Sequence, residues 1–175
     1  SQGQRDITEF LSNHTTVVSN DREMINPYEL DIYLPKHNLA IEYCGLYWHS
    51  ELYKDTNYHL NKTIKCQECG IRLIQIFEDE WLENEELIKE KLLNIIGKST
   101  KDRIYARKCS FVNVSKQTKQ QFLNDNHIQG DGKSSINIGL TYNNELVAMM
   151  CFFRRKDGVY ELNRFATSAN VLGGF

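Results

Sequence analysis

The sequence lacks hydrophobic runs long enough to cross a membrane, because no stretch of about 18 apolar residues occurs in it. The first four residues, Ser1 to Gln4, have neither the basic nor the apolar region of a signal peptide, so neither membrane insertion nor secretion is indicated. A hydrophobic share of 41% among 175 residues is still sufficient for a buried core. We expect one large domain or two small ones.

Cysteine lacks the regular spacing of a disulfide framework. The five cysteines, an odd number, fit a reducing compartment better. Cys66 and Cys69 have the CxxC spacing of a zinc pair, but Cys44, His49 and His59 offer no second pair at a recognisable spacing. We therefore favour a structural interpretation, in which Cys66 is buried on a helix that ends near Cys69.

The chain as a whole also lacks a large excess of either positive or negative charge, since its formal net charge is -2. Its two halves, however, differ in the sign of their charge. Residues 1–97 carry 9 Lys and Arg against 17 Asp and Glu, whereas residues 98–175 carry 12 against 6. The basic part favours attraction to phosphate. The acidic part has enough carboxylates to hold a metal ion, although such a surplus is also typical of a solvated surface.

The hydrophobic patterns of residues 1–97 predict an α/β arrangement. Helices are expected over 2–13, 57–68 and 85–96, a short strand at 16–18, a β-hairpin over 28–44 and a strand over 71–77. The strand at 71–77 is apolar enough to lie inside a sheet with both faces covered. Strand 39–44, helix 57–68 and strand 71–77 form a βαβ unit, so the two strands should be parallel.

The hairpin brings two acids together. If its turn is symmetric about Lys36 and His37, the apolar residues share one face and Asp31 falls directly opposite Glu42 on the other. Two like charges at that spacing repel each other unless a cation lies between them. We therefore expect a divalent cation at Asp31 and Glu42, with Mg²⁺ or Mn²⁺ as the hard ion that prefers oxygen ligands.

Further polar residues follow the ends of the two parallel strands, where open α/β sheets bind ligands. His49 is a candidate general base or phosphate partner, and Asp79 is a candidate third metal ligand. Alternatively, His49 is a structural histidine, and Asp79 is one of the acids in the first turn of a helix. Tyr47 and Trp48 are expected either in the core or stacked on DNA bases.

A boundary is expected at the polar stretch that follows residue 97, after which the pattern changes. Residues 98–175 predict a small α+β domain. Its elements are a strand over 103–108, a helix over 115–126 with Ser115 as N-cap, and strands over 135–142, 145–154 and 159–166. Asn143 and Asn144 are expected to form the hairpin turn between two of these strands. The pattern stops without a terminating element, so we expect a longer natural chain.

Three segments together closely resemble one family of nucleases. They are Glu29-Leu-Asp31, Ala40-Ile-Glu-Tyr-Cys-Gly-Leu-Tyr-Trp-His-Ser-Glu51 and Ile76-Phe-Glu-Asp-Glu-Trp81. They are similar to phage homing endonucleases of the EDxHD type, whose nuclease domain resembles the very short patch repair (Vsr) endonuclease and the PD-(D/E)XK superfamily. The resemblance covers residues 1–97 and implies a restriction-endonuclease-like mixed sheet flanked by helices. It also implies a phage-encoded enzyme in the cytoplasm of a bacterial host.

The resemblance implies roles for individual residues. Asp31 would bind the metal, His49 would be the catalytic histidine, Asp79 would be the closing aspartate, and Tyr47 and Trp48 would intercalate at the cut site. The family's first acid falls on Gln4, although Asp6 or Glu9 would serve with a shifted register. Gln4 is thus a natural or engineered change that would inactivate the nuclease. The restriction-type lysine is also missing, since Cys44 stands in its place.

Two stretches of the second part are Asn126-His-Ile-Gln-Gly130 and Tyr160-Glu-Leu-Asn-Arg-Phe165. By these stretches residues 103–175 resemble an acetyltransferase-like domain of phage DNA-modification proteins, in a truncated form without the acyl-CoA loop. No activity is carried over from that likeness. The basic excess instead favours a DNA-targeting role. The expected DNA contacts beyond Tyr47 and Trp48 are Lys62, Lys133, Arg154, Arg155 and Lys156. The sequence thus predicts a Mg²⁺-dependent endonuclease acting on double-stranded DNA. A homodimer would suit double-strand cutting, and the alternative is a non-catalytic DNA-binding module on a decayed nuclease fold.

Overall fold

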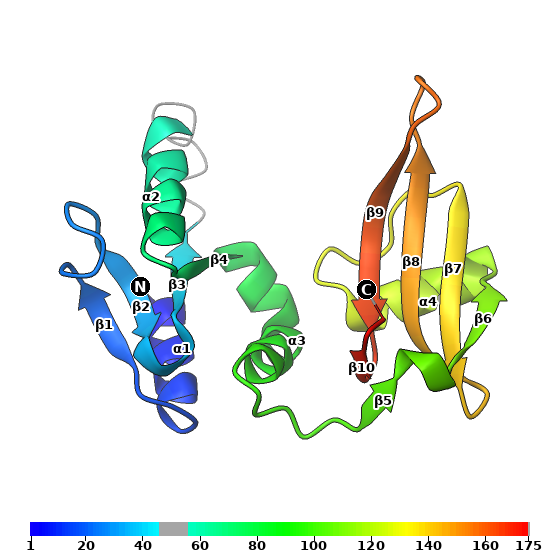
Figure 1. The fold of residues 1–175 in the computed structure, drawn as a ribbon, viewed down its shortest axis with the longest axis horizontal. Helices are drawn as coiled ribbons and strands as arrows, with labels where there is room; N and C mark the ends of the chain where they lie inside the picture. The colour runs from blue at the N-terminus through cyan, green and yellow to red at the C-terminus, as the bar shows by residue number, and fades with distance from the viewer. Residues whose placement is uncertain (46–55, 175) are drawn as a thin grey trace. The chain divides into compact units, whose positions relative to one another are not determined.

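A computed structural model of the chain describes residues 1–45 and 56–174. These residues form two compact units, Ser1–Lys89 and Glu90–Phe175 (Figure 1). The division falls within helix α3 (Glu78–Ile95), earlier than the boundary expected after residue 97. Over the described ranges, we find no helix with both the length and the apolar character that a membrane span requires.

The first unit is built on a mixed four-stranded sheet in the order β1-β2-β3-β4. Its strands are β1 (Val18–Asp21), β2 (Leu30–Leu34), β3 (Leu39–Cys44) and β4 (Arg72–Phe77). Its helices are α1 (Gln2–Ser12), α2 (Thr56–Glu68) and the first part of α3. The predicted α/β class is confirmed, because β1, β2 and β3 pair antiparallel whereas β3 and β4 pair parallel.

The β2–β3 hairpin has the register that its turn predicts. Leu34 pairs with Leu39 and Ile32 with Ile41. A short 3-10 turn over Pro35–His37 leads to Asn38, which adopts a left-handed conformation with φ of 47°. The expectation that the apolar residues share one face was incomplete, since Tyr33 and its partner Ala40 are also buried. Both faces of the hairpin therefore contribute to the core.

Two helices pack against β3 from opposite faces. On α1, Gly3 lies so close to the Tyr43 ring that an added Cβ would come within 2.3 Å of it. On α2, Cys66 is fully buried in a cluster with Ala40. Because successive side chains of a strand point to opposite faces, Ala40 and Glu42 face α2 while Tyr43 faces α1.

Strand β4 is parallel to β3 as predicted, but the expectation that both its faces are covered was wrong. Among the described strands β4 is at the edge of the sheet, and only Ile76 of its six residues is buried. Helix α3 begins directly after it at Glu78 and is divided by non-helical torsion angles at Asn84. The part after Asn84 is the helix predicted over 85–96, and the part before it was not predicted as a separate helix. The acidic first turn of α3 complements the positive end of the helix dipole.

In the second unit, which also includes the end of α3, a helix packs against an antiparallel sheet in the order β6-β7-β8-β9, and β5 and β10 form a separate parallel pair. The helix is α4 (Lys116–Asn126). The strands are β5 (Arg103–Tyr105), β6 (Ser110–Asn113), β7 (Ile136–Tyr142), β8 (Glu145–Arg154), β9 (Tyr160–Thr167) and β10 (Asn170–Leu172). A 3-10 turn, Ala106–Lys108, occupies the end of the strand expected over 103–108, and β6 and β10 were not predicted.

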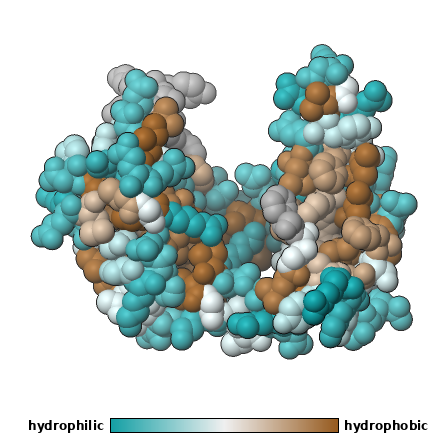
Figure 2. Space-filling model, in the orientation of Figure 1, coloured by the Kyte–Doolittle hydropathy of each residue, from teal (hydrophilic) through white to brown (hydrophobic). Residues whose placement is uncertain are grey.

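Two local predictions in the second unit are confirmed. Ser115 caps α4, because its side chain accepts a hydrogen bond from the Thr118 amide. Asn143 and Asn144 join β7 to β8 with φ of 50° and 65°, the left-handed conformations that a tight type I′ hairpin turn needs. Mainly hydrophilic residues surround the turn between β8 and β9, at the upper right of Figure 2.

Candidate functional site

The β2–β3 hairpin brings Asp31 and Glu42 together as predicted. The backbone amide of Asp31 donates to Oε1 of Glu42 at 3.2 Å, and Oδ2 of Asp31 accepts from the amide of Tyr43 at 3.0 Å. Each carboxylate is thus bonded to the backbone of the opposite strand. The two acids are positioned by the sheet itself and need no loop to bring them together.

Lys62 of α2 forms an ion pair with Oε2 of Glu42, with both side chains largely buried, at 5% and 13% exposed. This corrects the expectation that Lys62 contacts DNA from the surface. Lys62 lies one helical turn before the buried Cys66, so both project toward the sheet. That four-residue spacing was visible in the sequence, but a lysine on a polar helix is normally exposed, so the pair was missed.

Several influences act on the pKa of Glu42, the acid that pairs with Lys62. Burial raises the pKa of Glu42, the charge of Asp31 raises it further, and the hydrogen bond from Lys62 opposes both. Burial together with the charges of Glu42 and Asp31 raises the pKa of Cys44 to about 11. Cys44 therefore stays a neutral thiol near neutral pH and supplies no positive charge at this position.

Gln4 of α1 lies beside Asp31, where the resemblance places the missing acid. Its side-chain amide nitrogen donates to the backbone oxygen of Asp31 at 3.2 Å and to Oδ1 of Asn20 at 3.1 Å. Asp6 instead accepts a hydrogen bond from Gln2, and Glu9 is exposed. Of the three positions considered on α1, Gln4 is the one with a bond to the Asp31 strand.

The other predicted site residues lie near the end of the parallel strands or outside the described residues. Asp79 is the second residue of α3, is exposed, and accepts a hydrogen bond from the amide of Glu80 at 2.9 Å. It follows the paired ends of β3 and β4, where Cys44 pairs with Phe77. The predictions for Tyr47, Trp48 and His49 fall outside the described residues.

The donor set of the hairpin suits a hard divalent cation with water as additional ligand. Within residues 1–45 and 56–174, no cluster of three or more His, Cys, Asp or Glu side chains could hold a metal ion. Asp31 and Glu42 are two such ligands, and Mg²⁺ in proteins is commonly held by one or two carboxylates and several waters. The mutual repulsion of the two acids would be relieved by such an ion.

The basic residues predicted to contact DNA in the second unit are all exposed, and they lie near one end of its sheet. The loop that leads from Lys133 into β7 is fastened to the end of β8. The amide of Ser135 donates to the Phe152 oxygen at 2.7 Å, and its hydroxyl accepts from the Arg154 amide at 3.1 Å. This end of the sheet carries Lys133, Arg154, Arg155 and Lys156.

Comparisons of the chain with family models, with curated proteins and with solved structures gave no match. The class of protein that the fold defines is a mixed α/β protein with a pair of carboxylates on a central hairpin. Any function proposed for it therefore depends on the geometry of the described residues and on the resemblance of its motifs.

Proposed function

We propose that the chain is a Mg²⁺- or Mn²⁺-dependent DNA endonuclease that hydrolyses phosphodiester bonds, similar to phage homing enzymes of the Vsr-like type. The observation that carries the proposal is the arrangement of Asp31, Glu42 and the buried Lys62. Glu42 accepts from the Asp31 amide and pairs with the Lys62 ammonium group, so two acids of neighbouring strands and one cationic side chain lie close together. Metal-dependent phosphodiester hydrolysis uses oxygen ligands for a cation together with positive charge near the phosphate.

Asp31 and Glu42 would hold the metal ion. Asp79, the third ligand that the resemblance implies, does not form a three-ligand group with them among the described residues, so water would fill the remaining positions. When bound, a divalent ion supplies positive charge to a phosphate oxygen and lowers the pKa of a bound water. Asp31 is held toward the site by the Tyr43 amide, which fixes the direction of its second oxygen. His49 would take up or deliver the proton of the reaction.

Lys62 would take the part of the lysine that is missing at Cys44. Its ammonium group is buried and paired with Glu42, which holds it in place. In that position it would stabilise the negative charge that develops on the phosphate. A neutral Cys44 thiol beside it adds no competing charge.

The basic end of the second unit would attach the enzyme to its DNA substrate, with Lys133, Arg154, Arg155 and Lys156 contacting backbone phosphates. Tyr47 and Trp48 would stack on bases at the cut. We further propose that the enzyme acts in the cytoplasm of a phage-infected bacterium, as a homodimer where both strands are cut.

Cleavage of supercoiled plasmid in Mg²⁺ tests the nuclease proposal. Because the chain carries Gln4, the assay uses it alongside Gln4→Glu, which introduces a carboxylate at the position where the resemblance places the family's first acid. Cutting should increase in Gln4→Glu and be lost when Asp31→Ala or His49→Ala is added. Asp102→Ala, which removes an exposed carboxylate from the second unit, is the matched control and should cut normally. Equal cutting by all of these variants would exclude the proposal.

A second candidate is a non-catalytic DNA-binding module on a nuclease fold. The observation that favours it is Gln4, whose amide donates hydrogen bonds where an acid would bind metal. Such a module would bind duplex DNA in EDTA, and it would still fail to cut in Mg²⁺ after Gln4→Glu. The plasmid assay combined with a binding assay therefore distinguishes the two candidates.

A further inference from the structure

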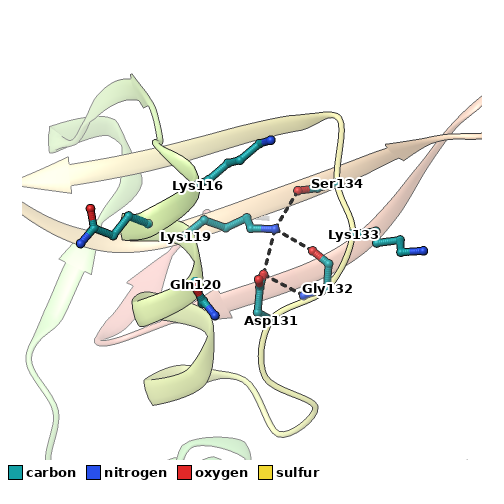
Figure 3. A pocket seen from close by; sticks show the side chains of 8 residues that line it. Lys116, Lys119, Gln120, Asp131, Gly132, Lys133 and Ser134 are labelled. Atoms are coloured by element: carbon teal, nitrogen blue, oxygen red, sulfur yellow. Dashed lines mark hydrogen bonds and ion pairs between the residues drawn. The ribbon is translucent and has the colours of Figure 1, made fainter.

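A polar cavity of about 700 Å³ lies in the second unit, between α4 and the loop that precedes β7. Figure 3 shows α4 on one side of it and the loop residues Asp131 to Ser134 on the other. Its lining contains three lysines but one acid. The lining residues are Lys116, Gln117, Lys119, Gln120, Asp131, Gly132, Lys133 and Ser134.

Lys119 organises this cavity without being available to a ligand. It is buried, and its ammonium group contacts Oδ1 of Asp131 at 2.8 Å, the Gly132 oxygen at 2.6 Å and the Ser134 hydroxyl at 3.1 Å. An ammonium group has three hydrogens, so these three contacts use its donors. The charge of Lys119 is therefore offset by Asp131, and its effect is to hold the loop against α4.

The loop is also held from β9. Nε of Arg164 donates to the Gly130 oxygen at 3.2 Å, and the Asn163 side chain donates to the Lys133 oxygen at 2.6 Å. Asn124 of α4 accepts from the Asp131 amide at 3.0 Å. A loop fixed by side chains of α4 and β9 presents its own side chains in a defined arrangement, which lowers the entropic cost of binding.

Lys116 and Lys133 provide the charge that the loop does not offset. Among the described residues, the structure shows no hydrogen-bond or ion-pair partner for either ammonium group. In Figure 3, Lys116 extends across the cavity toward the loop, and Lys133 points outward from its rim. With Lys119 paired to Asp131, the positive charges left are that of Lys116 over the cavity and that of Lys133 at its rim, and Gln117 and Gln120 add exposed side-chain amides to the lining.

We propose that this cavity is a phosphate-binding site. Two ammonium groups and two amides offer many donors, and a phosphate group is an anion with several acceptor oxygens. Lys133 also lies next to the basic end of the sheet, because Ser135, two residues after it, is hydrogen-bonded to the end of β8. The phosphate would belong either to a DNA backbone that follows this basic surface or to a free nucleotide. Duplex binding and calorimetry with small phosphates distinguish these two ligands.

Binding of a fluorescent duplex in EDTA, followed over a range of salt concentrations, tests the DNA source. Lys116→Ala and Lys133→Ala should each weaken binding about three- to tenfold, the range of one charged hydrogen bond partly exposed to water. Each should also reduce the slope of log K against log salt by about 1. Lys101→Ala is the matched control, because it removes one exposed lysine outside the cavity and should leave the slope unchanged.

Calorimetry with inorganic phosphate and with a nucleoside triphosphate tests whether the cavity binds a small phosphate ligand. Heat of binding that disappears in Lys116→Ala, with duplex binding unaltered, would support a phosphate site for a small ligand. The proposal is overturned if neither assay responds to Lys116→Ala and Lys133→Ala, or if Lys101→Ala has the same effect. Because no cleavage is measured, these outcomes are independent of the nuclease proposal.

Discussion

Replacing Lys62 by Met tests whether the buried ion pair with Glu42 is the electrostatic centre of the first unit. Met is close to Lys in length but carries no charge, so the change removes the ammonium group and keeps most of the packing. Glu42 would remain only 13% exposed with Asp31 beside it and no cation to offset the two charges. The free energy of unfolding of this unit should therefore fall.

The expected loss is about 3 kcal/mol, since removing one partner of a buried ion pair typically costs about 3–5 kcal/mol. We place it at the lower end because Glu42 keeps the hydrogen bond from the Asp31 amide. It can also take up a proton, since its pKa is already raised by burial and by Asp31. Adding Glu42→Leu to Lys62→Met should restore stability to within about 1 kcal/mol of the parent, because the isolated charge is then removed as well.

Urea unfolding followed by tryptophan fluorescence measures this effect in the right unit. Both tryptophans, Trp48 and Trp81, belong to residues 1–89, and Trp81 is 3% exposed. Lys65→Met is the matched control, because Lys65 lies on the same helix with a side chain 41% exposed. Its removal should change stability by no more than about 0.5 kcal/mol.

Mg²⁺ adds a direct test of the metal assignment. A cation at Asp31 and Glu42 would offset the charge that Lys62→Met exposes, so Mg²⁺ should stabilise this variant more than the parent chain. At 100 times the dissociation constant the gain would be about 2.7 kcal/mol. The electrostatic reasoning is refuted if Lys62→Met unfolds like the Lys65→Met control. The metal assignment is refuted if Mg²⁺ stabilises both chains equally or neither.

Three further predictions concern packing, pH and capping. Gly3→Ala should destabilise the first unit by about 1–3 kcal/mol, because the added Cβ meets the Tyr43 ring, and thermal unfolding should show recovery when Tyr43→Leu is added. In the second unit the hydrogen bond from Lys119 lowers the pKa of Asp131, so this carboxylate stabilises the fold above the unfolded-state pKa of about 3.9. Circular dichroism should therefore show stability lost as the pH falls below about 4, and a smaller loss over that range in Asp131→Asn. Ser115→Ala should cost about 1 kcal/mol in chemical unfolding by leaving the Thr118 amide uncapped, and a change below 0.3 kcal/mol would contradict the cap.

Local patterns predicted the parts of the fold that depend on neighbours in the chain. The alternation around Lys36 and His37 was sufficient to give the pairs Leu34 with Leu39 and Ile32 with Ile41. A hairpin with a short turn has few possible registers, and a shift of one residue would turn its apolar side chains to the opposite face. The closeness of Asp31 and Glu42 follows directly from that register.

The same reasoning failed where the answer depended on what packs against an element. Residues 71–77 are apolar enough for a covered strand, but no described strand pairs beyond β4, so most of it is only half-buried or exposed. The first part of α3, before the kink at Asn84, was not predicted as a helix because its acidic first turn carries no apolar stripe. Patterns of hydrophobicity record how apolar a segment is, but they do not record which partner covers it.

For the candidate site, the sequence by itself determined that Asp31 and Glu42 meet across a hairpin, because strand periodicity and turn length are properties of adjacent residues. Only the tertiary structure decided that Lys62 completes the pair and that Gln4 lies beside Asp31. Both depend on how α2 and α1 dock onto the sheet, through contacts such as Cys66 with Ala40 and Gly3 with Tyr43. Docking is set by the fit of side chains from distant segments, and no periodicity in the chain encodes that fit.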